Sequence, residues 1–183
     1  MTEEKSVDRR TIHGVLLAVF NRGSLIRGAS GTGKSELTLE LISRGHRLVA
    51  DDAVRISRRG NELFGGAPEL TGGVLAVGPL GLVSVAGVFG EEALQTEVKI
   101  DICIDLTRED KEDHPDLLSG VRPVEEFLGV QVPLVRLDIT RRPASSVIVE
   151  TAVKMLDHPS ANVARRLAAE HDSSMIHSSS IPQ

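Results

Sequence analysis

The feature that most restricts the fold of this chain is a glycine-rich octapeptide that matches the pattern G-x-x-x-x-G-K-[ST] without a mismatch. It consists of Gly28, Ala29, Ser30, Gly31, Thr32, Gly33, Lys34 and Ser35. The preceding residues, Ser24–Arg27, predict a short strand, and Glu36–Arg44 carry apolar residues at helical spacing before Gly45. A strand, a loop of this kind and a helix in this order are typical of an α/β domain with a phosphate-binding loop.

Each part of this loop suits the binding of a phosphate chain. Glycines allow successive backbone N–H groups to turn toward an anion without a Cβ in the way. The helix that follows directs the positive end of its dipole at the same anion. Lys34 supplies a cation for the outer phosphates, and the Ser35 hydroxyl is a natural ligand for Mg²⁺. A chance glycine-rich turn would not need the strand and helix around it, so the sequence predicts a site for a nucleoside triphosphate or a close relative.

Composition excludes several other classes of protein. The 183 residues suit one domain, and the aromatic residues are four phenylalanines, so the core must consist of aliphatic side chains. A net charge of −5 argues against a nucleic-acid partner. The apolar stretches are too short to cross a membrane and Met1–Arg10 is too polar for a signal peptide, so we expect a cytoplasmic protein. The lone Cys103 lies in an apolar run and is expected to be buried rather than reactive.

The remaining pattern predicts one α/β domain over residues 11–171, between a flexible start at 1–10 and a disordered tail at 172–183. The predicted strands cover residues 13–20, 47–50, 54–58, 62–65, 74–77, 82–85, 98–106 and 132–137. Helices are expected at residues 145–156 and 160–171, and an exposed, mobile loop at 107–118. The strand at 13–20 should form a hairpin with the strand that leads into the phosphate loop, and 54–58 should form a surface hairpin with 62–65. The many glycines of residues 65–90 disfavour helix there.

Asp51 and Asp52 are the first candidates for chemistry at the bound phosphates. They end the strand that follows the phosphate-loop helix, and the carboxyl ends of strands are where α/β sheets place reacting groups. One carboxylate can hold Mg²⁺, and the other can accept a proton from an attacking hydroxyl. The alternative is that the two aspartates form a solvated turn that only ends the strand.

His13 and three arginines are weaker candidates. His13 stands at the head of the strand predicted to pair with the phosphate-loop strand, although a single histidine is more often structural than catalytic. Arg122, Arg141 and Arg142 lie on either side of the last predicted strand. An arginine there can stabilise a transferring phosphoryl group, while the alternative is an ordinary surface arginine.

Taken together, the stretches Gly28–Glu36, Leu39–Leu41 and Arg44–Asp52 resemble the catalytic domain of HPr kinase/phosphorylase. His13–Leu16 also resembles the strand before the loop in that family, and weaker similarity appears at residues 68–70, 80–85, 128–133 and 142–153. The resemblance implies a P-loop-containing, phosphoenolpyruvate-carboxykinase-like mixed sheet with flanking helices. Because residues 1–12 leave no room for the family's N-terminal domain, we expect a short form with the catalytic domain only.

The resemblance implies an enzyme that uses ATP and Mg²⁺ to phosphorylate a serine of HPr, a small phosphocarrier protein of the sugar phosphotransferase system, and that reverses this step by phosphorolysis. It also implies a homo-oligomer. Carried over to this chain, Lys34 binds the phosphates, Ser35 and Asp51 are the Mg²⁺ ligands, and Asp52 is the general base, with Asp51 and His13 beside it. Arg122 corresponds best to the family's catalytic arginine.

The chain departs from the family pattern at the signature region. Where the family carries Glu-x-Arg-Gly-Leu-Gly, this chain reads Ala76-Val77-Gly78-Pro79-Leu80-Gly81, so a glutamate that binds Mg²⁺ and an arginine are absent. A basic residue near Arg142 is replaced by serine as well. These departures put the phosphorolysis activity in question. They leave two alternatives to the protein kinase: an ATP-sensing regulatory module with little catalysis, and a small-molecule kinase on the same framework.

Overall fold

A computed structural model describes residues 8–68, 73–108, 123–140 and 145–158 of the chain. The expected helix at 160–171, the tail at 172–183 and most of the loop at 107–118 lie outside the described residues, as do Arg122, Arg141 and Arg142. Within the described residues no helix is long and apolar enough to cross a membrane.

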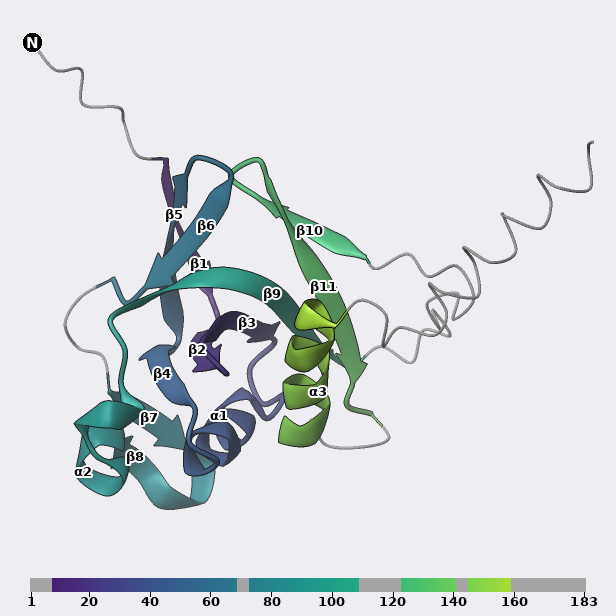
Figure 1. The fold of residues 1–183 in the computed structure, drawn as a ribbon. Helices are drawn as coiled ribbons and strands as arrows, with labels where there is room; N and C mark the ends of the chain where they lie inside the picture. The colour runs from purple at the N-terminus through teal and green to yellow at the C-terminus, as the bar shows by residue number, and fades with distance from the viewer. Residues whose placement is uncertain (1–7, 69–72, 109–122, 141–144, 159–183) are drawn as a thin grey trace, which may run out of the picture.

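A mixed nine-stranded sheet with flanking helices forms the body of the molecule (Figure 1), which confirms the expected mixture of strands and helices. Its strands are β1 (Arg9–His13), β2 (Val15–Val19), β3 (Arg22–Gly28), β4 (Arg47–Ala50), β5 (Ala53–Arg59), β6 (Glu62–Gly66), β9 (Glu97–Thr107), β10 (Val124–Phe127) and β11 (Val130–Asp138). A separate hairpin pairs β7 (Val74–Val77) with β8 (Gly81–Ser84). The helices are α1 (Lys34–Ser43), α2 (Val85–Phe89), α3 (Ser146–Asp157) and the 3₁₀ turns η1 (Gly78–Leu80) and η2 (Glu91–Ala93).

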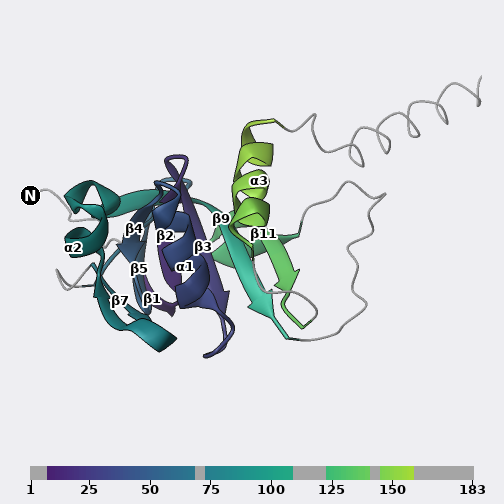
Figure 2. The same ribbon diagram turned by 90° about the horizontal axis from the view of Figure 1, so that it is seen from below.

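The strand order decides which loops meet. The main path is β1-β5-β6-β9-β3-β2-β4, with β11 added to β9 and β10 to β11. Strand β2 is antiparallel to both of its neighbours, β3 and β4, while β9 is parallel to β3 and β11 is parallel to β9. Four strands, β3, β4, β9 and β11, therefore run in the same direction, and their carboxyl ends lie at one edge of the sheet (Figure 2).

Strand β9 is buried on both of its faces because the sheet curls around it. Ile102, Ile104 and Leu106 pack with the helices α1 and α3, whereas Val98 and Ile100 face a second core on the other side of the sheet. The pairing of β9 with β3 shifts register between Gly23 and Ser24 of β3. This shift places Ile100 in a different core from the two isoleucines that follow it, Ile102 and Ile104.

Several sequence expectations are corrected by the structure. Arg9 and Arg10 belong to β1, which pairs with β5, so the ordered part of the chain begins before residue 11. The hairpin of β5 and β6 is not a surface feature, because Val54, Ile56 and Leu63 are fully buried in the main sheet. A short helix, α2, forms within the glycine-rich stretch, where Ser84 caps it by accepting a hydrogen bond from the N–H of residue 87. Strand β10 was not predicted.

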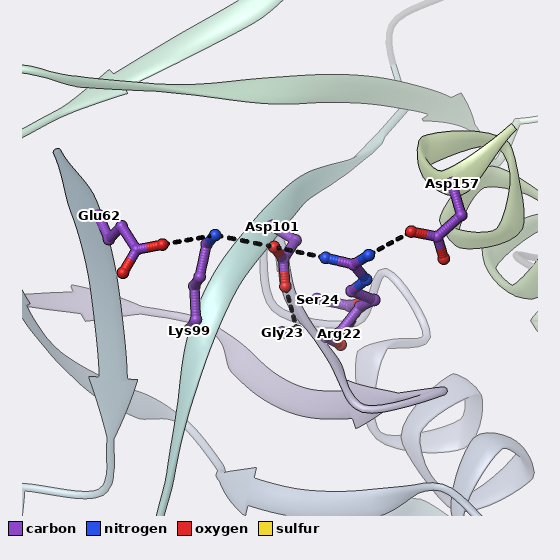
Figure 3. A network of polar contacts seen from close by, with 7 residues as sticks. All are labelled: Arg22, Gly23, Ser24, Glu62, Lys99, Asp101 and Asp157. Carbon is purple, nitrogen blue, oxygen red and sulfur yellow. Dashed lines mark hydrogen bonds and ion pairs between the residues drawn. The ribbon is translucent and has the colours of Figure 1, made fainter. Parts of the chain in front are cut away.

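An ion-pair network fixes the start of β3, at the edge of the sheet away from the phosphate loop (Figure 3). Asp101 of β9, whose side chain is only 11% exposed, accepts hydrogen bonds from the Gly23 N–H (3.2 Å) and the Arg22 guanidinium (3.5 Å). Lys99 lies 3.8 Å from the same carboxylate and continues the network to β6, and Arg22 also contacts Asp157 of α3. These contacts hold β3 in register with β9. The register in turn sets the position of the carboxyl end of β3 relative to β9.

A second polar cluster joins α3 to the end of α1. The Glu150 carboxylate accepts two hydrogen bonds from Arg44, from Nε at 2.8 Å and from Nη2 at 2.6 Å, and lies 2.8 Å from Nε2 of the buried His46. The Arg44 guanidinium, with His46, lowers the pKa of Glu150 to about 2. Because α1 carries the phosphate loop at its other end, this cluster anchors the helix on which the loop depends.

We expect Glu150→Gln to lower the free energy of unfolding by about 2 kcal/mol near neutral pH, since a nearly buried, charge-assisted contact is lost. The folded-state pKa lies below the ordinary value of 4.5, so this stabilisation is complete above pH 4.5 and is lost as the pH falls toward about 2. Urea unfolding at several pH values should show the difference between wild type and variant shrinking over that range.

Glu97→Gln is the matched control, because Glu97 also binds an arginine, Arg59, through both carboxylate oxygens, but at a site where both side chains are largely exposed. Its effect should stay below about 1 kcal/mol. An equal loss of stability in the two variants would contradict the structural role given to Glu150.

Candidate phosphate-binding site

The loop between β3 and α1 has the backbone conformation that its glycines predict. Gly31 and Gly33 have φ values of 75° and 89°, in the left-handed region that favours glycine. Gly33 is also the N-cap of α1 and offers no side chain to the helix, so the first N–H groups of α1 remain directed at the loop. This is the arrangement that binds an anion at a helix N-terminus.

Gly28 allows the loop to lie directly against β9. A Cβ at this position would lie 2.8 Å from Thr32 Oγ1 and 2.9 Å from the Leu106 carbonyl oxygen, both too close for a side chain. The Thr32 hydroxyl in turn donates a 2.8 Å hydrogen bond to the Ala29 carbonyl. The first glycine of the motif is therefore required by packing between the loop and the neighbouring strand.

Lys34 lies across the loop that it follows. Its Nζ donates hydrogen bonds to the carbonyl oxygens of Gly28 (2.8 Å) and Ala29 (3.0 Å). The ammonium group therefore stands over the cradle formed by residues 28–33, where the phosphates of a nucleotide would be bound. The Ser35 side chain, one residue further into α1, is partly exposed.

Asp51 lies within electrostatic range of Lys34. Burial raises the pKa of its carboxyl group, while hydrogen bonds from the N–H groups of Asp52 and Ala76 and the charge of Lys34 act in the opposite direction. The contact with Ala76 brings the β7–β8 hairpin next to Asp51. This hairpin also lies next to α1. Gly78, in the turn between β7 and β8, faces the Glu36 side chain of α1, and a Cβ on Gly78 would be 3.9 Å from Glu36 Oε1.

Asp52 is held in an unusual turn that presents its side chain to solvent. Its φ is 62°, and the turn is closed by a 2.7 Å hydrogen bond from the Ala53 N–H to the Asp51 carbonyl. The Gly14 N–H donates to the Asp52 carbonyl at 3.1 Å, and His13 Nδ1 lies 3.1 Å from Asp52 Oδ1. The two side chains are 60% and 82% exposed, so a large acceptor molecule can reach them.

The sheet explains why these groups meet. The phosphate loop follows β3 and the aspartate pair follows β4, and both strands end at the same edge because β2 between them runs the other way. From its sequence position, His13 was expected to begin β2. Instead it is the last residue of β1, where it pairs with Ala53 of β5 and contacts Asp52. The site thus combines a cradle for an anion, a cation, a half-buried carboxylate and an exposed carboxylate paired with histidine.

The remaining candidates are three arginines and Cys103. Arg122 and the pair Arg141 and Arg142 lie beyond the described residues. Cys103 is fully buried as expected, and burial raises the pKa of its thiol to about 12, so it is not a nucleophile. Within the described part of the chain, no group of three or more histidine, cysteine, aspartate or glutamate side chains is arranged to hold a metal ion by itself.

Arg108 is a further residue of the site, and it was not predicted because residues 107–118 are expected from the sequence to form a mobile loop. Its guanidinium donates a hydrogen bond to the Gly31 carbonyl of the phosphate loop. Arg108 directly follows β9, and Leu106 of β9 pairs with Gly28 of β3. The available signal for Arg108 was a basic residue directly after a predicted strand. That this strand, β9, lies beside β3 cannot be predicted from local sequence.

Three comparisons with known proteins agree. The family described as "HPr Serine kinase C-terminal domain" matches residues 4–170. The HPr kinase/phosphorylase of Lactococcus lactis subsp. lactis is 41% identical over 152 residues, 82% of this chain and 49% of that protein. The HPr kinase/phosphorylase of Bordetella avium is 40% identical over the same share of each chain. The solved structure of the Hpr(Ser) kinase/phosphatase from Coxiella burnetii superimposes with a TM-score of 0.73 and 30% identity, covering 83% of this chain and 99% of that one.

The extent of these matches differs between the two kinds of relative. The chain spans about half the length of the curated relatives it matches, and nearly all of the solved structure. The residues that the family model matches, 4–170, include the loop Gly28–Ser35 and the aspartate pair.

Proposed function

Since this chain belongs to the HPr kinase/phosphorylase family, we propose that it is an ATP- and Mg²⁺-dependent kinase that phosphorylates a serine of HPr or of a similar phosphocarrier protein, on a phosphoenolpyruvate-carboxykinase-like framework. The observation that carries the proposal is that β4 ends in the aspartate pair at the same end of the sheet as the phosphate loop, with Asp51 within electrostatic range of Lys34 and Asp52 exposed. A nucleotide in the cradle would then lie next to a carboxylate that is open to a protein acceptor.

The proposed reaction is direct transfer of the terminal phosphoryl group. The serine oxygen of the acceptor forms a bond to the γ-phosphorus, the bond to the β–γ bridging oxygen breaks, and ADP leaves. Asp52 takes the proton of the serine hydroxyl, and His13 orients the Asp52 carboxylate through their 3.1 Å contact. Lys34 and the N–H groups of the loop stabilise the charge on the phosphate oxygens. In phosphorolysis, inorganic phosphate would attack the phosphorus of the phosphoserine, the serine oxygen would leave with a proton from Asp52, and pyrophosphate would form.

The residues of the site are suited to Mg²⁺. This ion is usually held by one or two protein oxygens together with phosphate oxygens, rather than by a complete protein cage. The Ser35 hydroxyl and the Asp51 carboxylate, which lies close to Lys34, supply such oxygens. Bound there, Mg²⁺ would neutralise charge on the β- and γ-phosphates.

A transfer assay with radiolabelled ATP, Mg²⁺ and purified HPr tests the proposal. We expect label on a serine of HPr, identified by mass spectrometry. No transfer to HPr or to other phosphocarrier proteins would overturn the acceptor assignment. Tight ATP binding without any transfer or hydrolysis would instead favour the ATP-sensing module, and transfer only to a metabolite would favour the small-molecule kinase.

A further inference from the structure

Two arginines lie next to the phosphate loop, and their surroundings differ. Arg27, directly before the loop, donates to Asp105 from Nε (2.7 Å) and Nη2 (2.8 Å) and to Glu125 from Nη1 (3.1 Å). Two carboxylates therefore neutralise Arg27. Arg108, on the exposed side of the loop, donates to the neutral carbonyl of Gly31, and among the described residues no carboxylate forms an ion pair with it.

The contact at Gly31 also affects the direction of the loop's N–H groups. In a trans peptide the C=O and the following N–H point in opposite directions, so fixing the Gly31 carbonyl fixes the Thr32 N–H as well. That N–H donates only a long, 3.4 Å hydrogen bond to the Ala29 carbonyl. A phosphate oxygen is a stronger acceptor and would readily replace this weak internal bond.

We propose that Arg108 is a positioning residue of the phosphate site, which holds the Gly31–Thr32 peptide with its N–H toward the nucleotide and adds positive charge beside the loop. This inference rests on the proposed function. The guanidinium lies on the carbonyl side of this peptide, so Arg108 acts on the nucleotide through the peptide rather than by direct contact. Because a triphosphate carries more negative charge than a diphosphate, loss of the Arg108 charge should weaken triphosphate binding more.

Calorimetric titration of wild type and Arg108→Gln with a non-hydrolysable ATP analogue and with ADP tests this role. We expect affinity for the triphosphate to fall about tenfold, as for the loss of one charge-assisted hydrogen bond, and affinity for ADP to fall less. Arg108→Lys should recover part of the triphosphate affinity, because it keeps the charge but not the planar arrangement of donors.

Arg58→Gln is the matched control. Arg58 is an exposed arginine that donates to a loop carbonyl, that of Leu128 at 3.0 Å, but far from the phosphate loop in the fold. Its removal should leave both affinities unchanged. Two results would overturn the role of Arg108 while leaving the proposed function intact. One is that Arg108→Gln binds both nucleotides as tightly as wild type; the other is that it loses affinity equally for both and Arg108→Lys recovers none of it. If wild type binds neither nucleotide, the proposed function fails and the role of Arg108 fails with it.

Discussion

Asp52→Asn should reduce phosphoryl transfer to HPr by about 1,000-fold while ATP affinity stays within about twofold of wild type. The amide cannot accept the proton of the serine hydroxyl at neutral pH. The phosphate cradle does not depend on this side chain, which is 82% exposed and contacts His13 rather than the loop. Single-turnover transfer assays and calorimetry on the same preparation separate the two effects.

Glu126→Gln provides the control for Asp52→Asn, because it removes one negative charge from an exposed position on β10, away from the site. It should transfer phosphate at the wild-type rate. If Asp52→Asn also kept wild-type turnover, Asp52 would not be the base. In that case Asp51, which burial has given a raised pKa, would be the next group to test.

Lys34→Ala should weaken ATP binding by about 100-fold, the loss expected when a cation with charge-assisted contacts to phosphate is removed. The variant also loses the hydrogen bonds from Nζ to the carbonyls of Gly28 and Ala29, so the loop is held less firmly before the nucleotide binds. A ligand that binds only the folded state raises its melting temperature. We therefore expect ATP to raise the melting temperature of wild type and to have little effect on the variant.

Lys154→Ala is the corresponding control, because Lys154 lies on α3, with Nζ 4.7 Å from the Phe20 ring centroid. Its removal should leave the shift produced by ATP intact. A full shift in Lys34→Ala would mean that the nucleotide does not use the cradle formed by residues 28–33.

Local sequence is enough to predict those features of the fold that depend on neighbouring residues. The loop Gly28–Ser35 lies between a strand and a helix, as its pattern predicted, because glycine conformation and helix propensity act within a few residues. The strands around Arg47–Ala50 and Val98–Leu106 were also predicted close to their observed ends. The position of Asp51 and Asp52 at a strand end followed from the same local signals.

Which of these segments contact one another depends on strand pairing across the whole sheet. His13 reaches Asp52 because β1 pairs with β5, and Arg108 reaches Gly31 because β9 is the parallel neighbour of β3. Strand pairing joins residues that are far apart in the chain, and its register depends on packing across the whole sheet. For the same reason the reversed direction of β2, rather than any motif, places the aspartate pair and the phosphate loop at one edge.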